Sequence, residues 1–376
     1  MPSLTEKDTP FLALDRARMD RNLARMRAHV EGLGVALRPH LKTVKSVPAA
    51  RRILGEMTSP ATVSTLQEAE AFAAAGCTDL VYAVGIAPAK LPRVAALRAT
   101  GVDLVVILDS VAQARAVVDA SKAAGAPIPA LIEIDCDDAR AGLAPGDPAL
   151  VEIGRILHAG AELRGVLTHG GASYRAFSPG AMMAMAAQER ASAVRCAEAL
   201  ATAGLPCPVV SIGSTPSAYF AQDFTGVTEV RAGVYTLSDL MMAGLGVGGI
   251  DDIALSVVTT VIGHQPRRGW ILTDSGFMAL SKDHGTAGMP VDQGYGLVAD
   301  IDGRPFGDLV VRGVSQEHGV LALREGSTAT LPDLPVGTLL RIYPNHACAT
   351  VGMHGSFAVT DGGREIVEDW PIMRGW

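Results

Sequence analysis

The sequence predicts a (β/α)8 barrel followed by an all-β domain, and three observations support this fold class. Over roughly the first two-thirds of the 376 residues, eight short apolar segments that favour strands alternate with helical patterns. No Gly-x-Gly-x-x-Gly turn joins an expected strand to an expected helix, which disfavours the competing architecture, a doubly wound open sheet. After residue 244, helical periodicity gives way to short apolar runs separated by Gly, Pro and Asp, which is typical of an all-β domain.

The elements follow in this order along the chain. A lone strand is expected at residues 9–14, and an amphipathic helix follows it, with apolar residues at helical spacing from Met19 to Val30. The barrel strands are expected at 35–38, 61–64, 79–84, 103–108, 129–135, 164–168, 207–212 and 228–231. The helices between them are expected at 66–75, 87–99, 111–123, 148–159 and 181–203. Later strands are expected at 253–262, 270–273, 297–301, 309–311, 320–323, 339–342 and 356–359.

This pattern predicts two domains. The barrel is expected to span residues 15–243, and residues 244–252, which include four glycines, are expected to form the linker. Residues 253–376 are expected to form the β-domain together with residues 1–14, because the lone N-terminal strand needs a sheet with which to pair.

Composition excludes several classes of protein. Hydrophobic residues make up 48% and charged residues 19%, so the chain is globular and not disordered. The net charge of −7 provides no basic surface for nucleic acid, and no uninterrupted apolar window of about 18 residues predicts a membrane span. The first ten residues lack the apolar core of a signal peptide, and the five cysteines form no CxxC pair. We therefore expect a cytoplasmic protein with reduced thiols.

In a barrel, functional side chains gather where the strands end, and Lys42 lies at such a position. It follows the expected strand 35–38, and Ser46 then provides a suitable N-cap for a helix. Lys45 is the rival reactive lysine, but it lies three residues further on. Lys42 is favoured because it sits directly at the strand terminus.

The loops after the seventh and eighth strands have the composition of an anion site. Gly213, Ser214 and Thr215 form a small hydroxyl-bearing turn, and Gly233 and Tyr235 follow the adjacent strand. Barrels frequently bind phosphate after these two strands, where backbone N–H groups converge. A lysine and a phosphate pocket on one barrel face suggest pyridoxal 5'-phosphate (PLP) held as a Schiff base.

The β-domain contains one constellation typical of a metal site. His346 and Cys348 are two residues apart, and on a strand they would point to the same face. Imidazole and thiolate are ligands that zinc prefers, although other divalent ions such as Mn2+ also accept them. Two protein ligands leave positions for water and substrate, as a catalytic zinc requires. A buried His–Cys pair in the core is the alternative interpretation.

These residues together resemble the D-threonine aldolase and D-serine dehydratase family, over essentially the whole chain. Its most specific segments are Arg-Pro-His-x-Lys-Thr, here at 38–43, and Pro-Asn-His-x-Cys, here at 344–348. The resemblance implies an alanine racemase type of fold, with Lys42 as the Schiff-base lysine and His346 and Cys348 as the metal ligands. It also implies a homodimer.

Further residues carry the resemblance residue by residue. Arg140 matches an arginine that faces the phenolic oxygen of PLP, and the segment from His169 to Tyr174 resembles the dehydratase version of the loop after the sixth strand. We expect Lys42, His169 and Tyr174 to be the catalytic residues. Val44 departs from the family, because many members have a histidine at this position.

The resemblance therefore implies a PLP- and zinc-dependent lyase that acts on D-β-hydroxy amino acids. Cys348 favours dehydration of D-serine or D-3-hydroxyaspartate to a keto acid and ammonia, because the aldolase members usually have aspartate at this position. Retro-aldol cleavage to glycine and an aldehyde is the first alternative. A metal-free amino-acid racemase and a non-enzymatic PLP carrier are the other two.

Overall fold

A computed structural model describes residues 2–376, which form two compact units. The barrel unit comprises residues 26–42, 50–233 and 375–376. The β unit comprises the residues up to Arg25 together with 43–49 and 234–374. The division falls within helices α1 (Arg16–Gly32) and α2 (Val47–Leu54), so each of these helices contributes to both units.

The barrel unit contains eight parallel strands, in the order β2-β9-β8-β7-β6-β5-β4-β3. The strands are β2 (Ala36–Pro39), β3 (Ala61–Val63), β4 (Asp79–Gly85), β5 (Asp103–Leu108), β6 (Pro129–Ile134), β7 (Glu162–Thr168), β8 (Val209–Ile212) and β9 (Glu229–Ala232). An isolated bridge between His40 and Thr62 joins the β2 side to β3, so the sheet closes on itself. The predicted fold class is confirmed.

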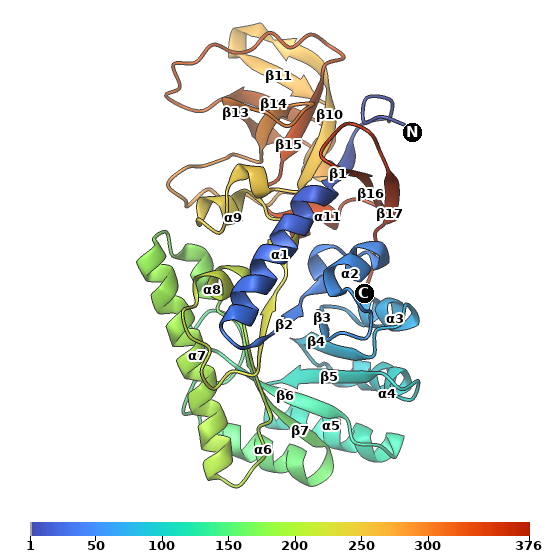
Figure 1. The fold of residues 1–376 in the computed structure, drawn as a ribbon, viewed down its shortest axis with the longest axis vertical. Helices are drawn as coiled ribbons and strands as arrows, with labels where there is room; N and C mark the ends of the chain where they lie inside the picture. Colours follow the sequence, from blue (N-terminus) through green and yellow to red (C-terminus); the bar gives the residue numbers. More distant parts are fainter. Residues whose placement is uncertain (1) are drawn as a thin grey trace. The chain divides into compact units, whose positions relative to one another are not determined.

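Helices cover the outer side of this sheet (Figure 1). They are α3 (Leu66–Ala74), α4 (Leu91–Arg98), α5 (Val111–Ala124), α6 (Ala149–Gly160), α7 (Pro179–Thr202) and α8 (Thr215–Phe220). Side-chain oxygens of Thr65, Ser110 and Ser178 cap α3, α5 and α7 by accepting a backbone N–H. Ser46 directly precedes α2, but its Oγ has no hydrogen-bond partner among residues 2–376. The side-chain cap predicted at Ser46 is therefore wrong.

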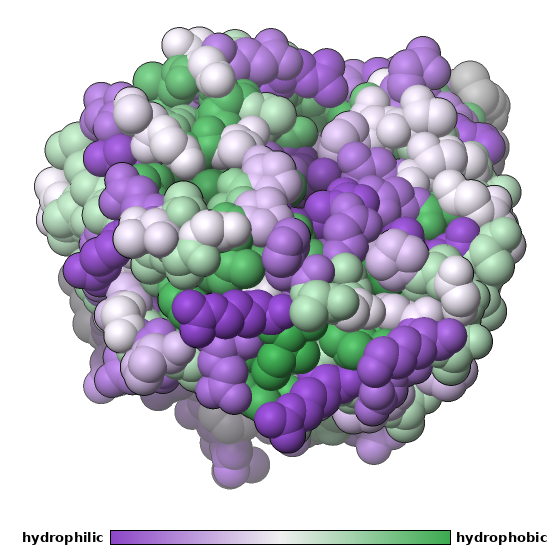
Figure 2. Space-filling view, turned by 90° about the horizontal axis from the view of Figure 1, so that it is seen from below, coloured by the Kyte–Doolittle hydropathy of each residue, from purple (hydrophilic) through white to green (hydrophobic). Residues whose placement is uncertain are grey.

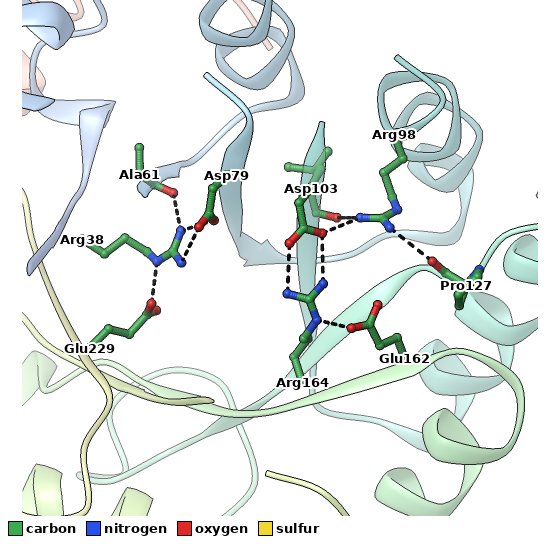
Figure 3. Close-up of polar contacts among 10 residues, drawn as sticks. Arg38, Ala61, Asp79, Arg98, Asp103, Pro127, Glu162, Arg164 and Glu229 are labelled. Atoms are coloured by element: carbon green, nitrogen blue, oxygen red, sulfur yellow. Dashed lines mark hydrogen bonds and ion pairs between the residues drawn. The ribbon is translucent and has the colours of Figure 1, made fainter. Parts of the chain in front are cut away.

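Ion pairs join the amino-terminal ends of the barrel strands (Figure 3). Arg38 of β2 donates to Glu229 of β9 at 2.7 Å and to Asp79 of β4 at 2.6 Å. Asp103 of β5 pairs with Arg164 of β7 at 2.9 Å. The chemistry of a barrel takes place at the opposite, carboxyl ends of the strands, so we infer that these ion pairs stabilise the barrel. Arg38 belongs to the segment that contains Lys42, and the structure gives it this supporting role.

The β unit is built on a nine-stranded sheet, in the order β11-β14-β13-β12-β15-β10-β1-β16-β17. Its strands are β1 (Phe11–Asp15), β10 (Leu255–Gln265), β11 (Trp270–Thr273), β12 (Leu297–Asp300), β13 (Pro305–Val314), β14 (Gly319–Leu323), β15 (Leu339–Tyr343), β16 (Ser356–Thr360) and β17 (Glu368–Pro371). Three short helices accompany them, α9 (Leu240–Gly244), α10 (Phe277–Leu280) and α11 (Ala347–Val351). Strand β1 pairs with β10 and β16, and its Phe11 and Ala13 pack with Val258 and Ala358 in the core.

No helix within residues 2–376 is long and apolar enough to cross a membrane. Figure 2 shows one face of the molecule, on which hydrophilic residues lie between smaller hydrophobic groups.

Candidate active site and metal pair

Lys42 follows β2 in a short 3-10 helix, Leu41–Thr43, and its side chain is half-buried. Its backbone N–H points toward Nδ1 of His40 at 3.5 Å, and Nε2 of His40 lies 3.4 Å from Oγ of Ser64. Burial, followed by the charges of Lys42 and Arg231, lowers the pKa of His40 well below its usual value. His40 is therefore a neutral imidazole beside Lys42. The rival Lys45 has a left-handed backbone, with φ of 46°.

A buried guanidinium lies in the barrel unit at the end of β9. Arg231 donates to Oγ of Ser211 and to the carbonyl oxygen of Thr168, both at 2.5 Å, and Ser211 in turn donates to Glu229 at 2.6 Å. Burial lowers the pKa of Arg231 to about 10, so it stays charged at neutral pH. Arg231 is the last residue of the strand expected at 228–231, but it was not among the predicted site residues. The signal was present, because an arginine on a buried barrel strand requires a partner.

His169 follows β7 and lies in the field of the same cations. Its Nδ1 lies 3.0 Å from the carbonyl oxygen of Gly213, which only accepts hydrogen bonds, so Nδ1 carries the proton and Nε2 has a free lone pair. Burial, with the charges of Arg140, Lys42 and Arg231, lowers the pKa of His169 to about 3. His169 is neutral over the physiological range of pH.

The barrel unit has a cavity of about 390 Å³ that brings together three of the predicted site residues, Arg140, His169 and Tyr174. The rings of His169 and Tyr174 are 6.4 Å apart, centroid to centroid. Arg140 is 62% exposed and lies 3.6 Å from Glu133, whose pKa is raised by burial. Arg175 also lines the cavity. The cavity therefore contains two guanidinium groups.

The predicted phosphate loop follows β8. Gly213 has φ of +138°, and a Cβ there would lie 2.1 Å from the carbonyl oxygen of Arg231, so only glycine fits. Oγ of Ser214 caps α8 by accepting the N–H of Ser217, and Oγ of Ser217 accepts the N–H of Ser214. The N–H of Gly213 donates to Glu189. Two of the N–H groups that were expected to bind an anion are thus already engaged, and Oγ of Ser214 already accepts a hydrogen bond.

The remaining two residues of the predicted phosphate site follow β9. Gly233 ends the main segment of the barrel unit, whereas Tyr235 belongs to the β unit, in the 3-10 helix Val234–Thr236. Tyr235 is buried. Val44, which stands where many family members have histidine, is completely buried in the β unit and contributes no imidazole there.

The predicted metal pair lies at the start of α11. His346 is the N-cap residue and Cys348 lies in the first turn, so the prediction that both stand on a strand is wrong. The chain turns into a helix at this point, and a carboxylate oxygen of Asp239 accepts the N–H of Ala347 at 2.9 Å. His346 and Cys348 nevertheless interact with each other. The first turn of α11, and not a strand, therefore brings the His346 and Cys348 side chains together.

Acidic groups surround His346. Its Nδ1 lies 2.6 Å from a carboxylate oxygen of Asp283, which leaves Nε2 for a metal. Burial alone would lower the pKa of His346, but Asp283, Cys348 and Asp239 together raise it to about 11. Oγ1 of Thr43 lies 3.3 Å from Sγ of Cys348.

The donor set of this pair, with its supporting carboxylate, fits a divalent metal such as zinc. Within residues 2–376, no group of three or more His, Cys, Asp or Glu side chains is arranged to hold a metal. Open coordination positions would therefore fall to water and substrate.

The fold and the site define a class of protein, the PLP-binding barrels with a β-domain. Residues 14–239 match the N-terminal domain of alanine racemase, and residues 254–360 match the putative serine dehydratase domain. The chain therefore belongs to the alanine racemase-type family of PLP-dependent enzymes.

Individual relatives refine this class. The chain is 49% identical to D-threo-3-hydroxyaspartate dehydratase of Delftia sp. (strain HT23), over 100% of this chain and 99% of that enzyme. The solved structure of that dehydratase has a TM-score of 0.95 and covers 100% of both chains at 48% identity. A cysteine-to-alanine variant of a D-threo-3-hydroxyaspartate dehydratase, in a metal-free form, has a TM-score of 0.96 with the same identity and coverage. D-threonine aldolase of Arthrobacter sp is 30% identical over 98% of this chain and 93% of its own length.

Proposed function

We propose that this chain is a PLP-dependent dehydratase that converts a D-β-hydroxy amino acid into a keto acid and ammonia. The observation that carries the proposal is the 49% identity to a D-threo-3-hydroxyaspartate dehydratase over the full length of both chains. Elimination releases water, and a second water is consumed when the resulting imine hydrolyses, so the net products are the keto acid and ammonia.

The residues of the barrel unit fit PLP. Lys42 supplies the amine, and Ser214 and Thr215 stand in the predicted phosphate loop after β8. The buried cation of Arg231 provides a positive field for an anionic cofactor. When bound, PLP withdraws electron density from the substrate α-carbon, which makes its proton removable.

Two nitrogen bases are available for this proton. Lys42 is the first candidate, because it would hold PLP and its amine could take up a proton once a substrate amine replaces it. His169 is the second, because its Nε2 is unprotonated while its Nδ1 is held by the carbonyl of Gly213. Tyr174, close to the His169 ring, is positioned to donate a proton or a hydrogen bond within the same cavity.

We further propose that His346 and Cys348 hold a divalent metal, zinc or a similar ion such as Mn2+, for the same reaction. Such a metal would supply Lewis acidity toward the departing hydroxyl. Asp283 would orient His346 by accepting its Nδ1–H. Within the β unit, Oγ1 of Thr43 lies 3.3 Å from Sγ of Cys348 and can orient the thiolate. The metal-free structure of a cysteine variant of a D-threo-3-hydroxyaspartate dehydratase also supports the proposed metal site.

The cavity favours a dicarboxylic substrate. Of its two guanidinium groups, Arg140 is matched to the cofactor, and Arg175 suits a second carboxylate, which D-3-hydroxyaspartate has and D-serine lacks. Retro-aldol cleavage is the second candidate function, supported by the 30% identity to a D-threonine aldolase. In that reaction the β-oxygen loses its proton and the Cα–Cβ bond breaks, with nearly the same residues in place.

One incubation series tests these proposals. The purified protein is supplied with D-threo-3-hydroxyaspartate, D-serine or D-threonine, with and without EDTA, and keto acid, ammonia, aldehyde and enantiomers are measured. We expect keto acid and ammonia, produced fastest from the hydroxyaspartate and abolished by EDTA. Glycine with an aldehyde would indicate the aldolase, and EDTA-insensitive inversion of configuration would indicate a racemase. Activity that survives complete chelation would remove the metal from the mechanism.

We also propose a homodimer, as the family resemblance implies, and a cytoplasmic location. Light scattering coupled to size-exclusion chromatography tests the dimer, because the formula mass of one chain is 39.0 kDa. A monomer at micromolar concentration would contradict it.

A further inference from the structure

A buried carboxylate that the proposed mechanism does not use lies between the two loops of the barrel mouth. Glu189 is on α7, and only 2% of its surface is exposed. Its Oε1 accepts the N–H of Gly170 at 2.7 Å and the N–H of Gly213 at 2.9 Å. Gly170 belongs to the loop after β7 and Gly213 to the loop after β8, so one oxygen atom ties two strand ends together.

Burying the charged carboxylate of Glu189 is energetically unfavourable. Burial raises the pKa of Glu189, and hydrogen bonds from Ser217, Gly213 and Gly170, together with the charge of Arg231, offset that effect. An acidic side chain is rarely buried without strong partners, and here two of the partners are backbone groups of site loops. Replacing it with an apolar residue would leave both N–H groups unpaired, so the carboxylate and the loops depend on each other.

The two loops carry the groups assigned to the cofactor site. His169 precedes Gly170, and its Nδ1–H donates to the carbonyl of Gly213. Ser214 follows Gly213, and its Oγ lies 3.0 Å from Oγ of Ser173 in the other loop. Glu189 binds the backbone of both loops next to these two hydrogen bonds. It therefore fixes the ring of His169 and the hydroxyl of Ser214 relative to each other.

We propose that Glu189 is a positioning residue that sets the phosphate-side loop of the cofactor site and orients His169. This inference rests on the proposed function, because it takes Ser214 and Thr215 as the residues that bind the cofactor phosphate. Glu189 acts through the two glycine N–H groups and does not touch the substrate.

Gly170 offers a second way to disturb the same contact. A Cβ at this position would lie 2.9 Å from Oε2 of Glu189, closer than real Cβ contacts allow. The backbone φ of Gly170 is −74°, which any L-residue adopts, so alanine introduces no backbone strain here. Gly170→Ala therefore displaces Glu189 selectively and keeps its carboxylate.

The test compares the holoenzymes of wild type, Glu189→Ala, Gly170→Ala and Glu189→Gln. Glutamine keeps the oxygen that accepts both N–H groups and is the conservative rescue. The matched control is Glu198→Ala, an exposed glutamate on the same helix. The two readouts are the affinity for PLP, from its visible absorbance during dialysis, and the 31P NMR resonance of the bound phosphate between pH 5 and 8.

We expect the wild-type resonance to be independent of pH, because a fixed phosphate does not titrate, whereas free phosphate groups titrate near pH 6. In Glu189→Ala and Gly170→Ala, PLP should bind roughly tenfold more weakly or worse, and the resonance should move with pH. Glu189→Gln and Glu198→Ala should resemble wild type. Gly170→Ala keeps the test decisive if Glu189→Ala does not fold.

Two results would overturn the inference. One is a pH-independent resonance with unchanged PLP affinity in both Glu189→Ala and Gly170→Ala. The other is an equal loss of PLP affinity in Glu189→Gln and Glu189→Ala. That result would mean that the charge of Glu189 matters, and not its hydrogen bonds to the two glycine N–H groups. A wild-type protein that binds no PLP would instead contradict the proposed function, and the two failures are therefore distinguishable.

Discussion

The histidines of the two units have opposite protonation chemistry. In the barrel unit, burial and neighbouring cations lower the pKa of His40 and bring that of His169 to about 3. In the β unit, Asp283, Cys348 and Asp239 outweigh burial and raise the pKa of His346 to about 11. One region is prepared to hold an anion, and the other is prepared to hold a cation.

This difference matches the two groups proposed for the reaction. The cofactor brings a phosphate, and Lys42 and Arg231 supply the positive field that a phosphate needs. A divalent metal needs the reverse, anionic surroundings, and its binding displaces the protons of imidazole and thiolate.

The largest expected effect tests the cationic region. Lys42→Ala should lower kcat by at least about 10²- to 10⁴-fold, because it removes the first candidate for the base that takes the α-proton. It should also abolish the covalent attachment of PLP, measured as an adduct trapped with borohydride. Lys45→Ala is the matched control and should retain both properties. A Lys42→Ala protein that still gives the trapped adduct would reject the assignment of the lysine.

The next effect tests the acidic region. Asp283→Asn should weaken zinc binding by about 10- to 100-fold, because the carboxylate that orients His346 is lost. Competition with a chromogenic chelator measures the zinc affinity, and the visible absorbance of PLP should not change. Asp292→Asn is a suitable control, since Asp292 pairs with a different histidine, His284. Unchanged zinc affinity in Asp283→Asn would argue against this orientation.

The third effect is a pH dependence. Without metal, His346 has a raised pKa and is protonated at neutral pH, so a metal that binds Nε2 must release this proton. Apparent zinc affinity should therefore rise with pH, by up to about tenfold per unit for each proton released. The sign for stability is opposite: in the metal-free protein the contribution of His346 is fully present below pH 6.5 and is lost as pH rises toward 11. Calorimetric titrations at pH 6, 7 and 8 measure the affinity, and an affinity that falls with pH would contradict the prediction.

The smallest effect sharpens the substrate preference. Arg175→Ala should raise KM for D-threo-3-hydroxyaspartate by about tenfold, because one charge-assisted contact to the second carboxylate is lost. KM for D-serine should stay within about twofold. Steady-state kinetics on both substrates measure the ratio, with Arg155→Ala, a substitution on helix α6, as the control. Equal changes for both substrates would remove Arg175 from recognition of the second carboxylate.

Much of this arrangement is predictable from the sequence, for physical reasons that particular residues illustrate. Strand periodicity gives the barrel, and once the barrel is known, its strand ends bring Arg140, His169 and Tyr174 to one cavity. Glu189 is not predictable in this way. Its partners lie 19 and 24 residues away, on loops that approach it only after the barrel has closed.

The metal pair shows a second limit. The spacing of His346 and Cys348 was interpreted as a strand, but the backbone turns into a helix because Asp239 accepts the N–H of Ala347 from more than a hundred residues away. Asp283, which contacts His346, is likewise distant in sequence. The types of residue predict the chemistry, whereas their geometry depends on partners that only the fold brings close.

The closure of the barrel has a consequence for its dynamics. Strands β2 and β3 meet through the isolated bridge of His40 and Thr62, and Arg38 spans the same seam by donating to the carbonyl of Ala61 at 3.3 Å. Subglobal opening starts where few backbone hydrogen bonds must break, so this seam is where the barrel should open first. Lys42 directly follows β2, and PLP joined to it would link its strand to the cofactor loops across the barrel mouth. Binding of PLP should therefore slow hydrogen exchange of the backbone amides in β3. The cofactor would then also stabilise the closed barrel against local opening.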